Sequence, residues 1–290
     1  MALATHLELG RVSNLPTVLT NVMAGVALTG VLVADIRLVA VLVAMALFYV
    51  AGMYLNDAFD RDIDARERPE RPIPSGRISA SAVFSIGFSL LAGGLILLAV
   101  AGWGMADGTT WRAPAAGLAL AGAIVAYDAW HKNNPLSPLL MGLTRMLVYV
   151  TAAAAVVQSL PMAVLEGALV MLAYLIGLTY VAKQENLVSF TGGWPLLFLA
   201  TPFVYFAFHV LDSPSGLALY AAFALWVAYA LSVLFRGGPG SVPKTVVSLI
   251  AGISLLDALF VVLGGYPMIA WSCAVGFIAT LFLQRYVSGT

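Results

Sequence analysis

Charged residues and cysteine are scarce in this sequence, and each shortage excludes a class of protein. Only 10% of the 290 residues are charged and 61% are hydrophobic, whereas soluble domains carry about 25% charged residues. An ordinary soluble domain is therefore excluded, and the composition indicates an all-α, polytopic membrane protein. The one cysteine, Cys273, lies in an apolar run. It rules out a disulfide framework within the chain and gives no sign of thiol chemistry.

The charges that are present balance, with 14 Lys and Arg against 14 Asp and Glu. A neutral total gives no reason to expect a nucleic-acid partner, and we expect none. The useful information is the position of each charge along the chain.

Ten apolar runs are long enough to cross about 30 Å of hydrocarbon, which takes roughly 20 helical residues. They lie near residues 16–34, 38–58, 82–102, 113–130, 138–158, 162–182, 193–211, 216–235, 244–264 and 267–285. The first run follows a polar start and lacks a small-residue cleavage site, so it is expected to be a retained span and not a signal peptide. For one of the last two runs, the alternative is a re-entrant segment.

The distribution of Lys and Arg sets the expected orientation. With the N-terminus inside, eleven of these cations fall in inside segments, while only Arg37 and Arg112 fall in outside loops. Because this split follows the positive-inside rule, the sequence predicts nine to ten transmembrane helices with both termini cytoplasmic. We expect one transmembrane domain over residues 1–290, in the inner (plasma) membrane and in contact with its lipids.

A row of oxygen ligands lies at the end of the second apolar run. Asn56, Asp60 and Asp64 recur every four residues, so on a helix their side chains share one face, about 6 Å apart per step. Mg²⁺ prefers such oxygens and usually takes one or two carboxylates together with substrate phosphates. The row, which also contains Asp57, therefore indicates a Mg²⁺ site for a phosphorylated ligand.

The segment after this row interleaves cations with prolines. Arg68 and Arg71 stand among Pro69, Pro72 and Pro74, which predicts a stiff, non-helical loop. Arginine binds phosphate oxygens with two parallel hydrogen bonds. We expect this loop to hold guanidinium groups over the site.

A second polar cluster lies at the end of the fourth run. It contains Tyr127, Asp128, His131 and Lys132, and Arg11 precedes the first run. All these groups are predicted on the cytoplasmic side, so we expect the functional site at that mouth. His131 alone, at an interface, is more typical of a surface residue than of a metal ligand.

The pattern Asn-Asp-x-x-Asp-x-x-x-Asp from Asn56, followed by Arg-Pro-x-Arg-Pro-Ile-Pro-Ser-Gly from Arg68, resembles the UbiA superfamily of intramembrane prenyltransferases. The residues 54–60, 134–138 and Arg145 look closest to its EboC-like bacterial subgroup. The resemblance implies Mg²⁺-dependent transfer of a prenyl group from a prenyl diphosphate to a lipophilic or small cyclic acceptor. The alternative is a carrier that binds a phosphorylated isoprenoid or metabolite without turnover.

The resemblance, together with the charged residues near the expected mouth of the site, suggests roles for particular positions. The expected metal ligands are Asn56, Asp57, Asp60 and Asp64; the diphosphate-binding residues are Arg11, Arg68, Arg71, Lys132, Arg145 and Lys183; and the catalytic residues are Asp60, Asp64, Tyr127, Lys183 and Glu185.

The sequence departs from the family after the sixth run. The family has a second motif there, Asp-x-x-x-Asp, whereas this chain reads Lys183-Gln184-Glu185-Asn186. We expect Lys183 to contact the diphosphate, with Glu185 and Asn186 as weak metal ligands or acceptor contacts. The alternative for Lys183 is an anchor at the membrane surface.

Two charges fall inside predicted spans, where a charge usually faces a cavity or a partner. For Arg145 the alternatives are pairing with Asp128 and contact with a ligand. Asp257 is either a hydrogen-bonded structural acid or a functional group. Asp128, Glu185 and Asp257 are the candidate bases.

Overall fold

Long apolar helices make up most of the chain. The computed structural model describes residues 2–31, 35–105, 107–132, 134–183, 193–209, 213–287 and 289, and within these ranges every regular element is helical. The elements are α1 (Ala2–Leu9), η1 (Val12–Asn14), α2 (Leu15–Ala27), α3 (Ile36–Phe59), α4 (Arg61–Glu67), α5 (Ala80–Trp103), α6 (Arg112–Trp130), α7 (Ser137–Ala154), α8 (Met162–Ala182), η2 (Trp194–Ala200), α9 (Thr201–Ala207), α10 (Pro214–Arg236), α11 (Ser241–Leu263) and α12 (Pro267–Leu283).

Seven of the described helices are long and apolar enough to cross a membrane: α3, α5, α6, α7, α8, α10 and α11. They match seven of the ten predicted spans. The other three predictions correspond to shorter segments, namely α2, the apolar pair η2 and α9, and α12. The chain is therefore a multi-pass membrane protein whose described regular elements are all helical, with seven described helices that meet this criterion.

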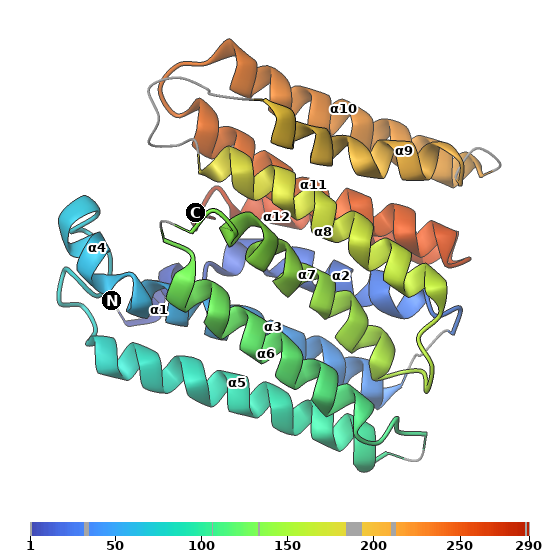
Figure 1. Ribbon diagram of the computed structural model, residues 1–290, viewed down its shortest axis with the longest axis horizontal. Coiled ribbons are helices and arrows are strands. Elements are labelled where there is room, and N and C mark those ends of the chain that lie inside the picture. Colours follow the sequence, from blue (N-terminus) through green and yellow to red (C-terminus); the bar gives the residue numbers. More distant parts are fainter. Residues whose placement is uncertain are drawn as a thin grey trace.

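The long helices lie side by side in two halves (Figure 1). In one half α3 packs along α5 and α6, and in the other α11 packs along α8, α10 and α12. Each half has its own buried apolar core, and α2 and α7 contribute side chains to both cores. These two helices thus join the halves.

Small residues let α2 and α7 approach closely, as is common between helices in lipid. A Cβ added to Gly25 of α2 would lie 2.8 Å from the backbone oxygen of Tyr149 on α7. This contact admits no side chain at position 25. The close approach brings the polar residues of α2 beside those of α7.

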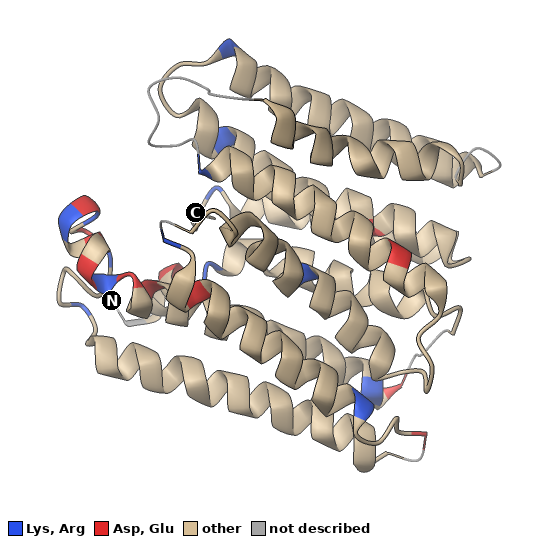
Figure 2. Cartoon of the chain, in the orientation of Figure 1, with Lys and Arg blue, Asp and Glu red and all other residues tan. Residues whose placement is uncertain are grey.

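Charged residues gather at one end of the bundle, where α4 and both chain ends lie (Figure 2). At this end α3 stops at Phe59, the loop with three prolines follows α4, and Ser79 caps α5 by accepting a hydrogen bond from the backbone N–H of Ala82. The chain ends meet through Asn14, whose side chain donates to the backbone oxygen of Gly289 at 2.8 Å.

Candidate active site

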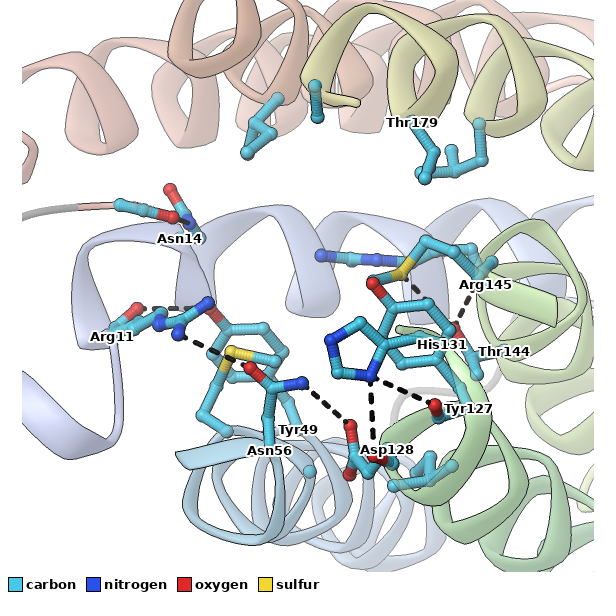
Figure 3. Close-up of a pocket in the computed structure, with 18 of the residues that line it drawn as sticks. Arg11, Asn14, Tyr49, Asn56, Tyr127, Asp128, His131, Thr144, Arg145 and Thr179 are labelled. Carbon is cyan, nitrogen blue, oxygen red and sulfur yellow. Dashed lines mark hydrogen bonds between the residues drawn. The ribbon is translucent and has the colours of Figure 1, made fainter. Parts of the chain in front are cut away.

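A cavity of about 290 Å³ opens inside the charged end of the bundle. Polar residues line one part of it and apolar residues the rest (Figure 3). The polar lining includes Arg11, Asn56, Asp60, Asp64, Arg68, Arg71, Tyr127, Asp128, His131, Lys132 and Arg145, and the apolar lining includes Val18, Phe48, Ile124, Val148, Leu178 and Ile253. The cavity therefore joins a charged region to an apolar region within the bundle.

The predicted row of oxygen ligands lies in this cavity, although not on one straight helix. Asn56 belongs to α3, the helix breaks at Asp60, and Asp64 belongs to α4. Helical hydrogen bonds continue across the break, since the Asp60 and Asp64 backbone N–H groups each donate to the backbone oxygen four residues earlier, at 2.9 Å. All three side chains line the cavity, although they come from two helices joined at Asp60.

Arg71, from the loop with three prolines, lies between two carboxylates of the row. Its guanidinium is 2.9 Å from Asp64 and 3.2 Å from Asp57. Arg11 contacts Asp57 at 3.0 Å and Asn56 at 3.4 Å. Asp57 is therefore held by two arginines and, unlike its neighbours in the row, is not among the residues lining the cavity.

Asp60 faces the second predicted cluster. His131 Nε2 and Lys132 Nζ each lie 3.3 Å from one of its oxygens. Burial raises the pKa of Asp60, but the hydrogen bond and charge of His131, together with Lys132, outweigh this and lower it. The expectation that His131 lies on the surface was wrong, because its side chain lines the cavity.

The pKa of Asp64 is shifted in the opposite direction, upward. Burial raises its pKa, and the charge of Arg71 offsets only part of this effect. The carboxylate of Asp64 therefore depends on Arg71 for compensation.

Asn56 and Asp128 connect α3 with α6. The Asn56 amide donates to one oxygen of Asp128 at 3.3 Å, and the other Asp128 oxygen is buried without a hydrogen-bond partner among the described residues. Beside them, Tyr127 stacks on His131 with ring centroids 4.9 Å apart (Figure 3). Asp128 thus orients the amide group of Asn56. Residues that hydrogen-bond to metal ligands usually orient them in this way.

The donor set suits Mg²⁺ if a ligand completes it. Asn56, Asp60 and Asp64 present hard oxygens to one cavity, and a buried Asp128 oxygen beside them has no hydrogen-bond partner in the described part of the chain. Within the described parts of the chain, no three His, Cys, Asp or Glu side chains lie close enough to hold a metal by themselves. This agrees with Mg²⁺ chemistry, in which water and substrate phosphate supply the remaining ligands.

Arg145 lies in the cavity and does not pair with Asp128, and its contact with a ligand stays a prediction. Asp128 is bonded to Asn56, and the Arg145 guanidinium donates to Asn21 at 2.6 Å and to Thr17 at 3.2 Å, above the ring of Tyr49 at 5.7 Å. Asp257 is fully buried and accepts hydrogen bonds from Thr20, Asn21 and Tyr149. Asp257 is therefore a hydrogen-bonded acid, and a functional role for it stays a prediction.

Of the residues that replace the second family motif, the structure describes Lys183. Lys183 Nζ donates to the backbone oxygen of Asn134 at 2.8 Å and to Ser137 at 3.0 Å, and it is not among the residues lining the cavity. Its contact with a diphosphate stays a prediction. Glu185 and Asn186 lie outside the described residues.

Sequence reasoning missed the contribution of the first helices. Asn14 and Tyr49 line the cavity, and Thr17 and Asn21 hold Arg145. Polar residues in the middle of an apolar run were the available signal for Thr17 and Asn21. A lone tyrosine in such a run gave no signal.

Curated relatives match part of the chain. A digeranylgeranylglyceryl phosphate synthase of Ignicoccus hospitalis is 46% identical over 97 residues, which is 33% of this chain and 31% of the relative. One of Methanothrix thermoacetophila is 43% identical over 100 residues, 32% of this chain and 35% of the relative. The matched segment thus spans about a third of the length of these relatives.

Solved structures match nearly the whole fold. A digeranylgeranylglyceryl phosphate synthase structure has a TM-score of 0.63 at 20% identity and covers 90% of this chain and 98% of its own. A UbiA homologue of Archaeoglobus fulgidus, bound to DMAPP and Mg²⁺, has a TM-score of 0.53 at 14% identity and covers 98% of this chain and 100% of its own. At these identities the likeness concerns the fold alone.

The EboC-like subgroup suggested by the sequence stays a prediction, since these comparisons do not distinguish it from the rest of the family. The sequence profile of the UbiA prenyltransferase family matches residues 18–288, almost the full length. The chain belongs to the UbiA prenyltransferase family.

Proposed function

We propose that this protein transfers a prenyl group from a prenyl diphosphate to a lipophilic or small cyclic acceptor, with Mg²⁺, inside the membrane. One observation carries the proposal. A single cavity joins the carboxylates and cations at the mouth of the bundle to an apolar region between its helices. A molecule with a charged head and a hydrocarbon tail fits such a cavity, and a prenyl diphosphate is one.

The residues at the mouth have complementary roles in this proposal. Asn56, Asp60 and Asp64 would hold the metal, and Arg11, Arg71 and Lys132, which now contact these acids or Asp57, would contact phosphate oxygens together with Arg68. When bound, the metal would neutralise negative charge on the departing diphosphate. Arginines aimed at the same oxygens add to this stabilisation, which is usually the largest catalytic effect.

The apolar lining has a different role. The allylic C–O bond breaks with its electron pair leaving on the diphosphate, and the acceptor attacks the resulting allylic cation and loses a proton. Side chains such as Phe48 and Ile124 would keep water from the cation. Of the candidate bases, Asp128 lines the cavity, Asp257 is bonded elsewhere and Glu185 lies outside the described residues. We propose that Asp128 takes the proton.

The relatives suggest which acceptors to try. Their shared name describes a product with two geranylgeranyl groups on glyceryl phosphate, so a monoprenylated glyceryl phosphate belongs in the test set. We also propose that residues 1–290 act as one domain in the inner membrane. The eleven-to-two split of Lys and Arg supports cytoplasmic termini and a site that opens to the cytoplasm.

The test uses the purified full-length protein in lipid nanodiscs. Dimethylallyl, geranyl, farnesyl and geranylgeranyl diphosphate are supplied with Mg²⁺ and a panel of acceptors, and pyrophosphate release and prenylated product are measured. Asp60→Ala serves as the inactive control, and Arg112→Gln, at the opposite end of α6, as the active one. Binding of donor without any turnover across the panel would favour the carrier instead.

A further inference from the structure

Three cations take no part in the proposed site, although they lie at the charged end of the bundle, where α10 and α12 end and α11 begins (Figure 1). We call Arg236, Lys244 and Arg285 the basic patch. Their side chains are exposed, and none of them has a hydrogen bond or an ion pair to another described residue. By contrast, Arg11 and Arg71 at the mouth each contact a carboxylate. The basic patch is therefore available to a ligand from outside the chain.

Packing of three neighbouring helices brings the basic patch together. Arg236 ends α10, and a short, exposed, glycine-rich loop leads to α11, whose first turn contains Lys244. Gln284, at the end of α12, donates to the backbone oxygen of Val247 on α11 at 3.2 Å. Val247 follows Lys244 by less than one helical turn, and Arg285 follows Gln284 directly. The three cations therefore come from adjacent helix ends.

No described acid neutralises the basic patch. From α8 to α12, the described acids are Glu166 and Asp257. Glu166 lies near the start of α8, at the opposite end of that helix from Lys183, and it accepts a hydrogen bond from Tyr205. Asp257 is fully buried and accepts from Asn21. Within the described residues the three positive charges are thus uncompensated, and together they attract an anionic ligand.

Exposed aromatic side chains adjoin the basic patch. Phe235 precedes Arg236 and is 65% exposed, and Tyr286 follows Arg285 and is 72% exposed. Phe282, one turn earlier on α12, is 54% exposed, and its ring centroid lies 5.1 Å from that of Tyr286. Aromatic residues beside cations at the end of a membrane span are typical of the boundary between hydrocarbon and headgroups. The basic patch therefore lies at the depth of the lipid headgroups.

We propose that the basic patch binds the headgroup of an anionic phospholipid whose acyl chains lie along the exposed faces of α10 and α12. A soluble phosphate would use only the cations, whereas a phospholipid also covers Phe235 and Phe282. Each Lys or Arg near a membrane surface strengthens the attraction to anionic lipid by about fivefold, so three cations give a preference of about 100-fold over a zwitterionic lipid. The bound headgroup would link the ends of α10, α11 and α12, beside Pro243 and Val246, which line the cavity.

The test measures lipid binding and not prenyl transfer, so its result is independent of the proposed function. Phosphatidylglycerol or phosphatidylcholine with identical acyl chains is titrated into the purified full-length protein in an uncharged detergent. The increase in melting temperature gives the affinity, and native mass spectrometry counts the bound lipids. Wild type should prefer phosphatidylglycerol by about 100-fold at low salt, and the preference should shrink as salt screens the charges. Glycerol phosphate, which has the charge without the chains, should bind far more weakly.

The variant that lacks the basic patch combines Arg236→Gln, Lys244→Gln and Arg285→Gln. It should lose the preference for phosphatidylglycerol, and each single substitution should weaken that lipid by about fivefold. If the combined variant does not fold, the three single variants are measured in its place.

The matched control removes the same number of charges from cations that already have an acid beside them. It combines Arg37→Gln, Arg61→Gln and Arg77→Gln. This control has the same net charge as the patch variant and should keep the preference for phosphatidylglycerol, because the basic patch is intact.

Three results would overturn the proposal. Wild type could bind the two lipids equally, which would leave the basic patch with a role in membrane orientation alone. The control could lose the preference as fully as the patch variant, which would assign it to the net charge of the protein. Glycerol phosphate could bind as tightly as phosphatidylglycerol, which would make the basic patch a site for a soluble phosphate.

Discussion

Replacing Arg71 tests whether the carboxylate row depends on its cations. Arg71 exposes 15% of its side chain, and Asp57 and Asp64 expose 8% and 5%. Removing one partner of a buried ion pair costs about 3–5 kcal/mol, because the other charge stays buried. Asp57 keeps Arg11 at 3.0 Å, so only Asp64 loses its compensation. We therefore expect Arg71→Gln to lower the free energy of unfolding by about 3 kcal/mol, at the low end of that range.

The assay is equilibrium unfolding of the full-length protein in mixed micelles without Mg²⁺, followed by tryptophan fluorescence. Arg66→Gln is the matched control, because Arg66 is exposed and contacts the backbone oxygen of Asp62. Such a surface change should stay within about 0.5 kcal/mol of wild type. If Arg71→Gln were no less stable than Arg66→Gln at neutral pH, the reasoning would be refuted.

The pH dependence gives a second check on the same variant. The charge of Arg71 lowers the pKa of Asp64, which burial raises, so losing Arg71 raises this pKa further. The folded variant then takes up a proton at a higher pH than folded wild type, and it gains stability relative to wild type as the pH falls. The difference in free energy of unfolding between wild type and Arg71→Gln should narrow as the pH approaches the ordinary carboxylate pKa of about 4. A widening difference would contradict the account.

Three further predictions concern other parts of the molecule. Chelating Mg²⁺ should abolish pyrophosphate release and adding it back should restore release. Asp60→Asn should lower release by more than about 100-fold, because losing an outer partner of a metal ligand already costs up to that much and Asp60 would hold the metal directly. Lys183→Gln should change the donor KM by no more than about twofold, because its ammonium is bonded to a turn; a tenfold increase would establish the predicted diphosphate contact. Gly25→Ala should destabilise by about 1–3 kcal/mol through its clash with the Tyr149 backbone, whereas Gly122→Ala, with nothing within 4 Å of the added carbon, should be neutral or slightly stabilising.

The long helices and the mouth of the site could be predicted because their signals are local. Apolar runs of about 20 residues identify α3, α5, α10 and α11. The spacing of Asn56, Asp60 and Asp64 and the arginines that follow them are contiguous in the chain, and the structure gathers them in one cavity. Local chemistry was enough to identify these residues as a group.

The deeper part of the site could not be predicted, because its contacts join distant segments. Asn21 and Asp257 are 236 residues apart in the chain and directly bonded. Arg145 reaches Asn21 across 124 residues. Nothing in the sequence near Arg145 distinguishes these partners from Asp128, which is closer along the chain.

The ion pairs at the mouth have a consequence for how the metal and the diphosphate affect each other's binding. Each carboxylate of Asp57, Asp60 and Asp64 already has a cation beside it. A metal ion alone would have to displace those cations, and a diphosphate alone would have to draw them away from their acids, so each ligand by itself leaves unbalanced charge. Together they exchange partners, and the positive charge of the metal offsets most of the negative charge of the diphosphate. We expect the affinity for either to rise when the other is present, and by the same factor in both directions.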